Sequence, residues 1–490
     1  MNRPIRNIAI ACLVLFAALL LNINYVQFVE ADSLNSKPNN RRVIDEEFSR
    51  DRGAILVDGD PVAESVKSKD EYKFQRRYPD AKLYASLTGS FSYIYGSSAL
   101  EYSQNRVLSG SDNRLFVNRV VDLVSNKQPK GGSVELTIDP LAQKAAAEGL
   151  ARLGKDTKGS VVAINPQTGA VLAMVNQPSY DPNKLASHDF TAVQKAYNAY
   201  TRDKDQPMLN RATQQTLPPG STFKLVTAAA ALENGVVDNI DDKIKAGARL
   251  TFPGTSYTLP NENGGNCGGD RITFEQALNV SCNVAFGALA GKIGQEKLNE
   301  QAAKFGFGTD PIDGLAANAS RFTSGGGRLE RTSLAQSGIG QYEVAATPLQ
   351  MAMVAAGIAN GGEVMKPYVV KTVRAPNLSV LEQAKPERLS EAMSNANAAK
   401  LREMMVSTVT RGTATSAQIS GVDVGAKTGT AQSTPDRPPY AWFVSFAGGD
   451  DPKVAVAVLV ESSDTARDEI AGGRLAGPIA KSVMEAVLGK

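Results

Sequence analysis

A serine and a lysine stand three residues apart where a helix is predicted to begin. Pro218–Gly220 would end any preceding element, and Ser221 then opens an alanine-rich segment that runs to about Gly235. The hydroxyl of Ser221 would lie at the positive end of the helix dipole, and Lys224 would share its face one turn away. A lysine whose pKa is lowered by burial or by a second cation can take the proton of such a hydroxyl. The alternative interpretation is an N-cap serine followed by a solvated lysine.

Two later segments carry groups that could complete such a site. Ser281 and Asn283 place a hydroxyl and an amide two positions apart after an apolar helical stretch. Because Val422–Val424 is typical of a strand, the residues after it would lie along a strand edge. They offer a cation, two hydroxyls and a glycine that leaves room for a ligand: Lys427, Thr428, Gly429 and Thr430. Each segment alone could be a loop end or an ordinary strand, but the three in this order are specific.

The composition limits which kinds of functional site the chain can contain. The single histidine, His188, excludes histidine-rich metal sites and leaves most acid–base chemistry to Lys, Asp, Glu or Tyr. Its neighbours, Ser187 and Asp189, are typical of a loop. With 53 Lys+Arg and 50 Asp+Glu, the net charge of +3 is too balanced for a protein that binds nucleic acid by neutralising phosphates. Three cysteines cannot build a disulfide framework or a four-thiolate zinc site.

An uncharged segment near the N-terminus predicts a membrane anchor. Arg3 and Arg6 precede Asn7–Val29, which has the roughly 20 residues that a bilayer crossing needs. Its strictly apolar part, Ile8–Leu21, would also suit a signal peptide, but a cleavage site is only weakly present, so an uncleaved anchor is favoured. Basic residues before the segment and acidic residues after it predict a cytoplasmic N-terminus, with everything after residue 30 exported.

Export changes what the cysteines can do. Cys12 lies in the predicted anchor, and Cys267 and Cys282 are the two cysteines outside it. In an oxidising compartment such a pair can persist as a disulfide, which is our hypothesis. Two buried free thiols are the alternative.

The length of 490 residues predicts more than one domain. We expect a cytoplasmic tip and transmembrane anchor over residues 1–30, a smaller β-rich, non-catalytic domain over 31–155, and the larger domain over 156–490. A strand-like piece, Ala54–Val57, lies in the smaller domain, and the polar break at Ser125–Gly132 is interpreted as a hinge. A helix follows, with Asp139 as its N-cap and Pro140 in its first turn.

The larger domain is predicted to be α+β. One hairpin would pair Ser160–Ile164 with Ala170–Val175, and a second would pair Ala441–Ala447 with Lys453–Glu461. Helical patterns lie between or after these hairpins: Thr222–Leu232, Phe274–Ile293, Pro348–Ile358 and Pro478–Leu488. Antiparallel hairpins at both ends with helices between them favour a layered antiparallel sheet rather than an alternating βαβ fold.

Together, Ser221-x-x-Lys224, Ser281-x-Asn283 and Lys427-Thr428-Gly429 resemble the three-motif set of penicillin-binding proteins and serine β-lactamases. Other segments are similar to class B penicillin-binding proteins across nearly the whole chain: Arg52–Ile55, Tyr180–Asn183, Asn210–Ala212, Pro219–Lys224, Gly338–Gln341, Thr347-Pro348, Ala359–Gly362 and Gly412–Ala414. The resemblance implies a penicillin-binding/serine β-lactamase-like transpeptidase domain, preceded by a pedestal or dimerisation-like domain and one transmembrane helix.

The resemblance also implies roles in a D,D-transpeptidase that cross-links peptidoglycan stem peptides. Ser221 would attack the carbonyl between two terminal D-alanines while Lys224 takes its proton. Ser281 would relay a proton to the leaving amine, with Lys427 maintaining the electrostatic balance, and Asn283 would hold the substrate amide. The substrate carboxylate would lie against Lys427, Thr428 and Thr430, and the backbone N–H groups of Ser221 and Thr430 would form the oxyanion hole.

The implied partners are stem peptides ending in D-Ala-D-Ala, β-lactams as covalent inhibitors, and proteins of wall synthesis and division. No metal or organic cofactor is implied. A D,D-carboxypeptidase and a β-lactamase or β-lactam sensor would share the three motifs, and a scaffold role is a further alternative. The anchor and the separate N-terminal domain disfavour the β-lactamase, and the intact motif set disfavours a purely structural role.

Overall fold

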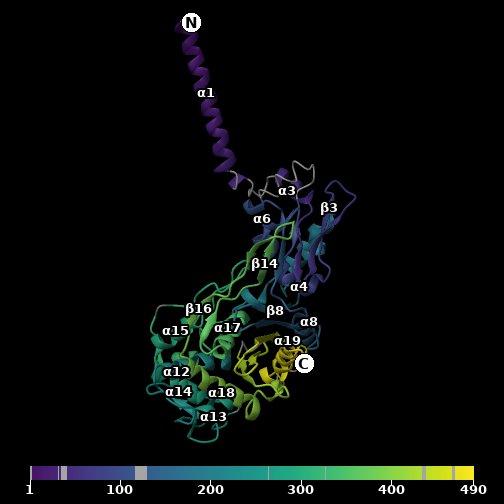
Figure 1. Ribbon diagram of the computed structural model, residues 1–490. Helices are drawn as coiled ribbons and strands as arrows, with labels where there is room; N and C mark the ends of the chain where they lie inside the picture. Colours follow the sequence, from purple (N-terminus) through teal and green to yellow (C-terminus); the bar gives the residue numbers. More distant parts are fainter. Residues whose placement is uncertain are drawn as a thin grey trace.

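The computed structural model describes residues 3–30, 33–34, 41–115, 130–262, 264–325, 327–432, 437–465 and 470–490. Most of the predicted hinge at Ser125–Gly132 lies outside these residues. Helix α1 (Arg3–Phe28) extends away from the rest of the molecule, and none of its residues is buried (Figure 1). It is long and apolar enough to cross a membrane, which fits a single-pass membrane protein. Which side of the membrane each end faces stays a prediction.

The N-terminal region is built on a sheet that also takes strands from the second half of the chain. Its order is β15-β14-β6-β1-β2-β3. These strands are β1 (Ile55–Val57), β2 (Asp60–Lys67), β3 (Phe74–Arg77), β6 (Ser133–Leu136), β14 (Val370–Arg374) and β15 (Val380–Gln383). β1 lies in the strand-like piece predicted at Ala54–Val57 and pairs with β2, and β14 runs antiparallel to β6. In Figure 1, β14 accordingly reaches up into the N-terminal region.

A buried ion cluster holds this region together. Glu101 is fully buried and accepts from Arg52 Nε at 2.7 Å and from Arg76 Nε at 2.6 Å. The hydroxyl of Tyr78 donates to the same carboxylate. Because removing one partner would leave a buried charge uncompensated, these residues constrain how the segments pack. The surrounding short elements are α3 (Arg41–Phe48), α4 (Ala81–Thr88), α5 (Ala99–Ser103), α6 (Asn105–Leu108), β4 (Phe91–Ser92) and β5 (Gly96–Ser97).

The larger body contains a five-stranded antiparallel sheet in the order β17-β18-β19-β7-β8. Its strands are β7 (Lys158–Ile164), β8 (Val171–Gln177), β17 (Val424–Ala431), β18 (Tyr440–Ala447) and β19 (Val454–Ser462). Both predicted hairpins are confirmed, and β17, which carries the Lys-Thr-Gly motif, is an edge strand. The α+β class with an antiparallel sheet is therefore confirmed.

Helices cover both faces of this sheet. Helix α17 (Pro348–Ala359) contacts β7, β18 and β19, whereas α19 (Gly472–Leu488) and α8 (Pro140–Ala151) lie together on the other side. All residues of β18 are buried as a result. Asp139 caps α8 as predicted, accepting from the backbone N–H groups of Leu141 and Ala142 at 2.8 and 3.0 Å.

Further helices and small hairpins surround the motifs. The helices are α9 (Asn183–Ala186), α10 (Phe190–Arg202), α11 (Arg211–Gln214), α12 (Lys224–Glu233), α13 (Phe274–Asn279), α14 (Asn283–Ile293), α15 (Gln295–Lys304), α16 (Arg331–Ser337) and α18 (Asn395–Arg411). The paired strands are β9 (Lys243–Lys245) with β12 (Arg271–Thr273), β10 (Arg249–Thr251) with β11 (Thr258–Pro260), and β13 (Glu363–Met365) with β16 (Arg388–Glu391).

Two predicted helices differ from the structure. The pattern over Phe274–Ile293 is not one helix but two, because Ser281 adopts a left-handed φ of 56° between α13 and α14. The last helix begins at Gly472 instead of Pro478. A Cβ on Gly472 would lie 2.1 Å from the Trp442 carbonyl oxygen, so close packing against β18 fixes the start of this helix.

Candidate active site

Ser221 lies in a tight turn that introduces α12. The 3-10 turn Gly220–Phe223 runs directly into this helix, and Ser221 is 7% exposed. Gly340 supports the turn from below: its carbonyl accepts from Gly220 N at 2.9 Å, and a Cβ on Gly340 would lie 2.1 Å from Gly220 O. The conformation of the turn therefore depends on a glycine in the segment 338–341. The Ser221 hydroxyl has no hydrogen-bond partner among the described residues and is free to face a ligand.

Two buried lysines meet at the hydroxyl of Ser281. The Nζ atom of Lys224 donates to Ser281 O at 2.7 Å, to Ser281 Oγ at 3.1 Å and to Asn283 Oδ1 at 2.7 Å. The Nζ atom of Lys427 donates to the same Ser281 Oγ at 2.9 Å and to Thr428 O at 2.8 Å. The structure therefore brings together groups from three segments that lie far apart in the sequence. At the left-handed break, the Ser281 hydroxyl accepts from both amines and its carbonyl accepts from Lys224.

The surroundings of the two lysines favour their neutral forms. Burial lowers the pKa of Lys224 well below its usual value, and the neighbouring charge of Lys427 lowers it further. Burial lowers the pKa of Lys427 to about 7. The carboxylate of Glu262 acts in the opposite direction on the pKa of both amines. A neutral amine has a lone pair, so Lys224 can act as a base at neutral pH.

The edge strand β17 lies directly against the serine turn. A Cβ on Gly429 would be 2.9 Å from Thr222 Cγ2 and 3.0 Å from Pro219 O, so only glycine permits this approach. The hydroxyl of Thr428 contacts that of Thr413 at 2.9 Å. Thr430 lines the same cavity as Ser221. The structure thus places the predicted ligand-binding strand beside the predicted nucleophile.

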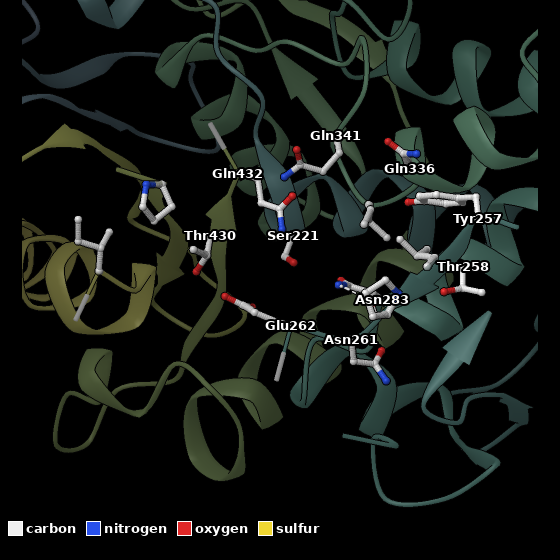
Figure 2. Close-up of a pocket in the computed structure, with 15 residues that line it drawn as sticks. Ser221, Tyr257, Thr258, Asn261, Glu262, Asn283, Gln336, Gln341, Thr430 and Gln432 are labelled. Carbon is white, nitrogen blue, oxygen red and sulfur yellow. Dashed lines mark hydrogen bonds between the residues drawn. The ribbon is translucent and has the colours of Figure 1, made fainter. Parts of the chain in front are cut away.

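Of the predicted site residues, Ser221, Asn283 and Thr430 line a cavity of about 1080 Å³. Figure 2 shows Ser221, Asn283 and Thr430 around it. Polar residues that were not predicted also line the cavity: Tyr257, Thr258, Asn261, Glu262, Gln336, Gln341 and Gln432. Gln341 belongs to a segment that resembles the family, but nothing in the sequence marked its side chain as part of the site. The loop residues Asn261 and Glu262 gave no signal at all.

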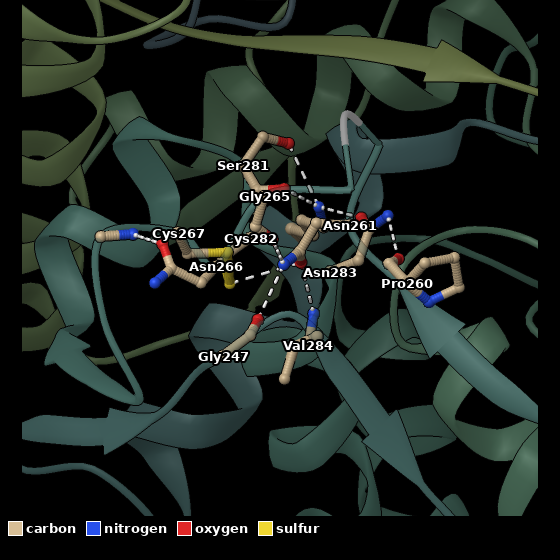
Figure 3. The surroundings of a disulfide bond; sticks show 12 residues. Gly247, Pro260, Asn261, Gly265, Asn266, Cys267, Ser281, Cys282, Asn283 and Val284 are labelled. Carbon is tan, nitrogen blue, oxygen red and sulfur yellow. Dashed lines mark hydrogen bonds between the residues drawn. A yellow bond between two sulfur atoms is a disulfide. The ribbon is translucent and has the colours of Figure 1, made fainter.

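The predicted disulfide is present in the structure. Cys267 and Cys282 are bonded, with their Cα atoms 5.8 Å apart, and Cys282 lies between Ser281 and Asn283 (Figure 3). The bond ties the loop after β11 to the turn that carries the second motif. Cys12 is free and exposed on α1.

His188 lies outside this cavity. It forms a bend between α9 and α10, where its Nδ1 atom contacts the carboxylate of Asp70. The loop position expected from its neighbours is therefore confirmed. Among the described residues, no three His, Cys, Asp or Glu side chains gather where they could hold a metal ion.

Comparison with known proteins identifies the family. Residues 159–485 match the penicillin binding protein transpeptidase domain, and residues 52–134 match the penicillin binding protein A dimerisation domain. The chain therefore belongs to the penicillin-binding protein transpeptidases, and its resemblance to class B penicillin-binding proteins is confirmed.

The relatives point to one branch of that family. The chain is 41% identical over 494 residues to the peptidoglycan D,D-transpeptidase PbpA of Mycolicibacterium smegmatis, covering 100% of this chain and 99% of that protein. It is 39% identical to PbpA of Mycobacterium tuberculosis over 493 residues, with the same coverage. Penicillin-binding protein A of M. tuberculosis, solved as a ceftriaxone acyl-enzyme complex, superimposes with a TM-score of 0.85 at 38% identity, covering 91% of this chain and 100% of that one.

Proposed function

We propose that this protein is a penicillin-sensitive peptidoglycan D,D-transpeptidase that works through an acyl-enzyme on Ser221. The observation that carries the proposal is that Ser221, Asn283 and Thr430 of β17 line one cavity, while the buried lysine pair is hydrogen-bonded to Ser281 and Asn283. The D,D-transpeptidase relatives and the β-lactam acyl-enzyme complex of a similar structure support it.

In the first step, the amine of Lys224 takes the proton of Ser221 as its oxygen attacks the carbonyl between the two D-alanines. The backbone N–H groups of Ser221 and Thr430 stabilise the oxyanion, each contributing on the order of 10²–10³ in rate. Ser281, hydrogen-bonded to both lysines, passes a proton to the departing D-alanine. An ester between the donor peptide and Ser221 remains. In the second step, an amine of another stem peptide attacks this ester.

The remaining groups bind the donor strand. Asn283 holds the peptide amide, and Lys427, Thr428 and Thr430 receive the terminal carboxylate. Gly429 allows the donor to lie along β17 as an additional strand beside this edge. A β-lactam would acylate Ser221 in the same position, and the ester would persist because no acceptor can displace it.

The rest of the chain would anchor and place this domain. We propose that α1 holds the protein in the cell membrane with a cytoplasmic N-terminus and an extracellular catalytic domain. Most of residues 31–155 would form a non-catalytic domain and most of residues 156–490 the transpeptidase domain, with α8 packed on the catalytic sheet and β14 and β15 joining the N-terminal sheet. Proteins of the wall-synthesis and division machinery would dock on the non-catalytic domain. The match to a dimerisation domain over residues 52–134 supports a role in assembly.

Product analysis with an added amine tests the proposed reaction. The full-length protein is given glycinamide and an acyl donor in which the D-alanine carbonyl forms a thioester. We expect it to form the new amide as well as the hydrolysed acid. Mass spectrometry distinguishes the two products. Hydrolysis alone at saturating amine would indicate a D,D-carboxypeptidase, and rapid turnover of penicillin G would indicate a β-lactamase.

A further inference from the structure

One acidic side chain lines the cavity, and the acylation chemistry does not use it. Glu262 is the sole acidic group among the described residues that line the cavity shared with Ser221 and Thr430. In Figure 2 it extends from the loop after β11 toward these two residues. Within the described part of the chain, its carboxylate forms no hydrogen bond or ion pair, and its side chain is exposed. It is therefore available to a ligand.

The backbone that carries Glu262 is fastened to the second motif. Asn283 Nδ2 donates to Pro260 O at 3.1 Å, and the backbone N–H of Val284 donates to Asn261 Oδ1 at 3.1 Å. Later in the same loop, the Cys267–Cys282 disulfide adds a covalent tie to the second motif. Figure 3 shows this disulfide and the hydrogen bonds around it. The backbone on both sides of Glu262 is thus tied to the segment that carries Ser281 and Asn283, which keeps its carboxylate at this cavity. A group placed in this way is pre-organised for a ligand.

Charge shows which substrate this carboxylate suits. The donor peptide ends in a carboxylate, which Glu262 repels. The acceptor, in contrast, is an amine that is mostly protonated in water and must lose a proton before it can attack. Glu262 attracts such a cation and has an oxygen lone pair for its proton.

We propose that Glu262 binds the ammonium group of the acceptor and takes its proton in the second half of the reaction. This inference rests on the proposed transpeptidase function. One N–H proton passes to the Glu262 carboxylate, and the freed nitrogen lone pair forms the new C–N bond with the ester carbonyl. The C–Oγ bond to Ser221 then breaks. A second N–H proton reaches Ser221 Oγ through Lys224, and Glu262 returns its proton to solvent.

The test compares an amine acceptor with a neutral one in the full-length protein. The donor thioester is supplied with either glycinamide or methanol, and acylation by fluorescent penicillin is measured separately. For Glu262→Gln we expect acylation and transfer to methanol to stay within about threefold of wild type, while the ratio of amine transfer to hydrolysis falls about 10²-fold, as for loss of a positioned base. Glu262→Asp should recover part of this loss. Glu300→Gln, an exposed position on α15, is the matched control and should change nothing.

Three results would overturn the inference: unchanged amine transfer in Glu262→Gln, an equal loss for glycinamide and methanol, or a loss of acylation in both Glu262 variants. The last result would place Glu262 in the first half-reaction. If wild-type protein transfers to neither acceptor and yields acid only, the transpeptidase function itself is wrong, which is a distinguishable outcome.

Discussion

Replacing Ser221 with alanine is expected to abolish covalent labelling by fluorescent penicillin, lowering acylation by at least ~10⁴-fold. The loss follows because Ser221 Oγ lies at the cavity with no hydrogen-bond partner among the described residues, whereas Ser281 Oγ accepts from two lysines. Its side chain loses only one oxygen atom, so the fold should be retained. The measurement is in-gel fluorescence of the full-length protein after penicillin labelling.

Cys267→Ser is the matched control for this experiment. The disulfide closes a loop with a sequence separation of 15, and its loss would destabilise the protein by about 3 kcal/mol while leaving the nucleophile in place. Labelling should therefore persist in this variant, with a lower melting temperature. Labelling that survives in Ser221→Ala would show that another residue is the nucleophile.

Replacing Lys224 with methionine is expected to lower the second-order rate constant of penicillin acylation by ~10³-fold, the range for loss of a general base. Methionine keeps an unbranched, buried side chain of similar length but has no lone pair on nitrogen. Stopped-flow measurement of acylation gives the rate constant. Lys292→Met, on the exposed face of α14, is the control and should acylate like wild type. A rate for Lys224→Met within tenfold of wild type would remove the assignment of this lysine as the base.

The sequence predicted the structure correctly where a helix cap, a turn or a short motif determines it locally. Asp139 and Pro140 predicted the start of α8, and turn residues predicted both hairpins of the catalytic sheet. The residue types of each motif indicated the chemistry that it could perform. The strand pattern before Lys427 also predicted that this lysine lies on a strand, although not that the strand is at the edge of its sheet. The pattern could not predict that Lys427 is buried, because a buried lysine and an exposed lysine on a strand have the same local sequence.

Features that depend on distant contacts were missed. Ser281 interrupts an apolar helical pattern with a left-handed backbone conformation, and its hydroxyl accepts from both lysines. The neighbouring residues contain no glycine or proline that would predict this interruption. β14 joins the N-terminal sheet by pairing with β6, more than 200 residues earlier in the chain, and hydrophobic alternation does not identify the partner of a strand. Glu262 lies in a polar loop, where a carboxylate is ordinarily a solvated residue.

The central claim is that a lysine with a strongly lowered pKa, not an imidazole, activates Ser221. The pH dependence of the acylation rate constant with penicillin G tests it most directly in wild-type protein. Because burial and Lys427 lower the pKa of Lys224 well below 10.5, the neutral base is already present near neutral pH. We predict that the rate rises from acidic pH and levels off well before pH 10. A rate that keeps rising about tenfold per pH unit up to pH 10, as an ordinary lysine requires, would contradict the account.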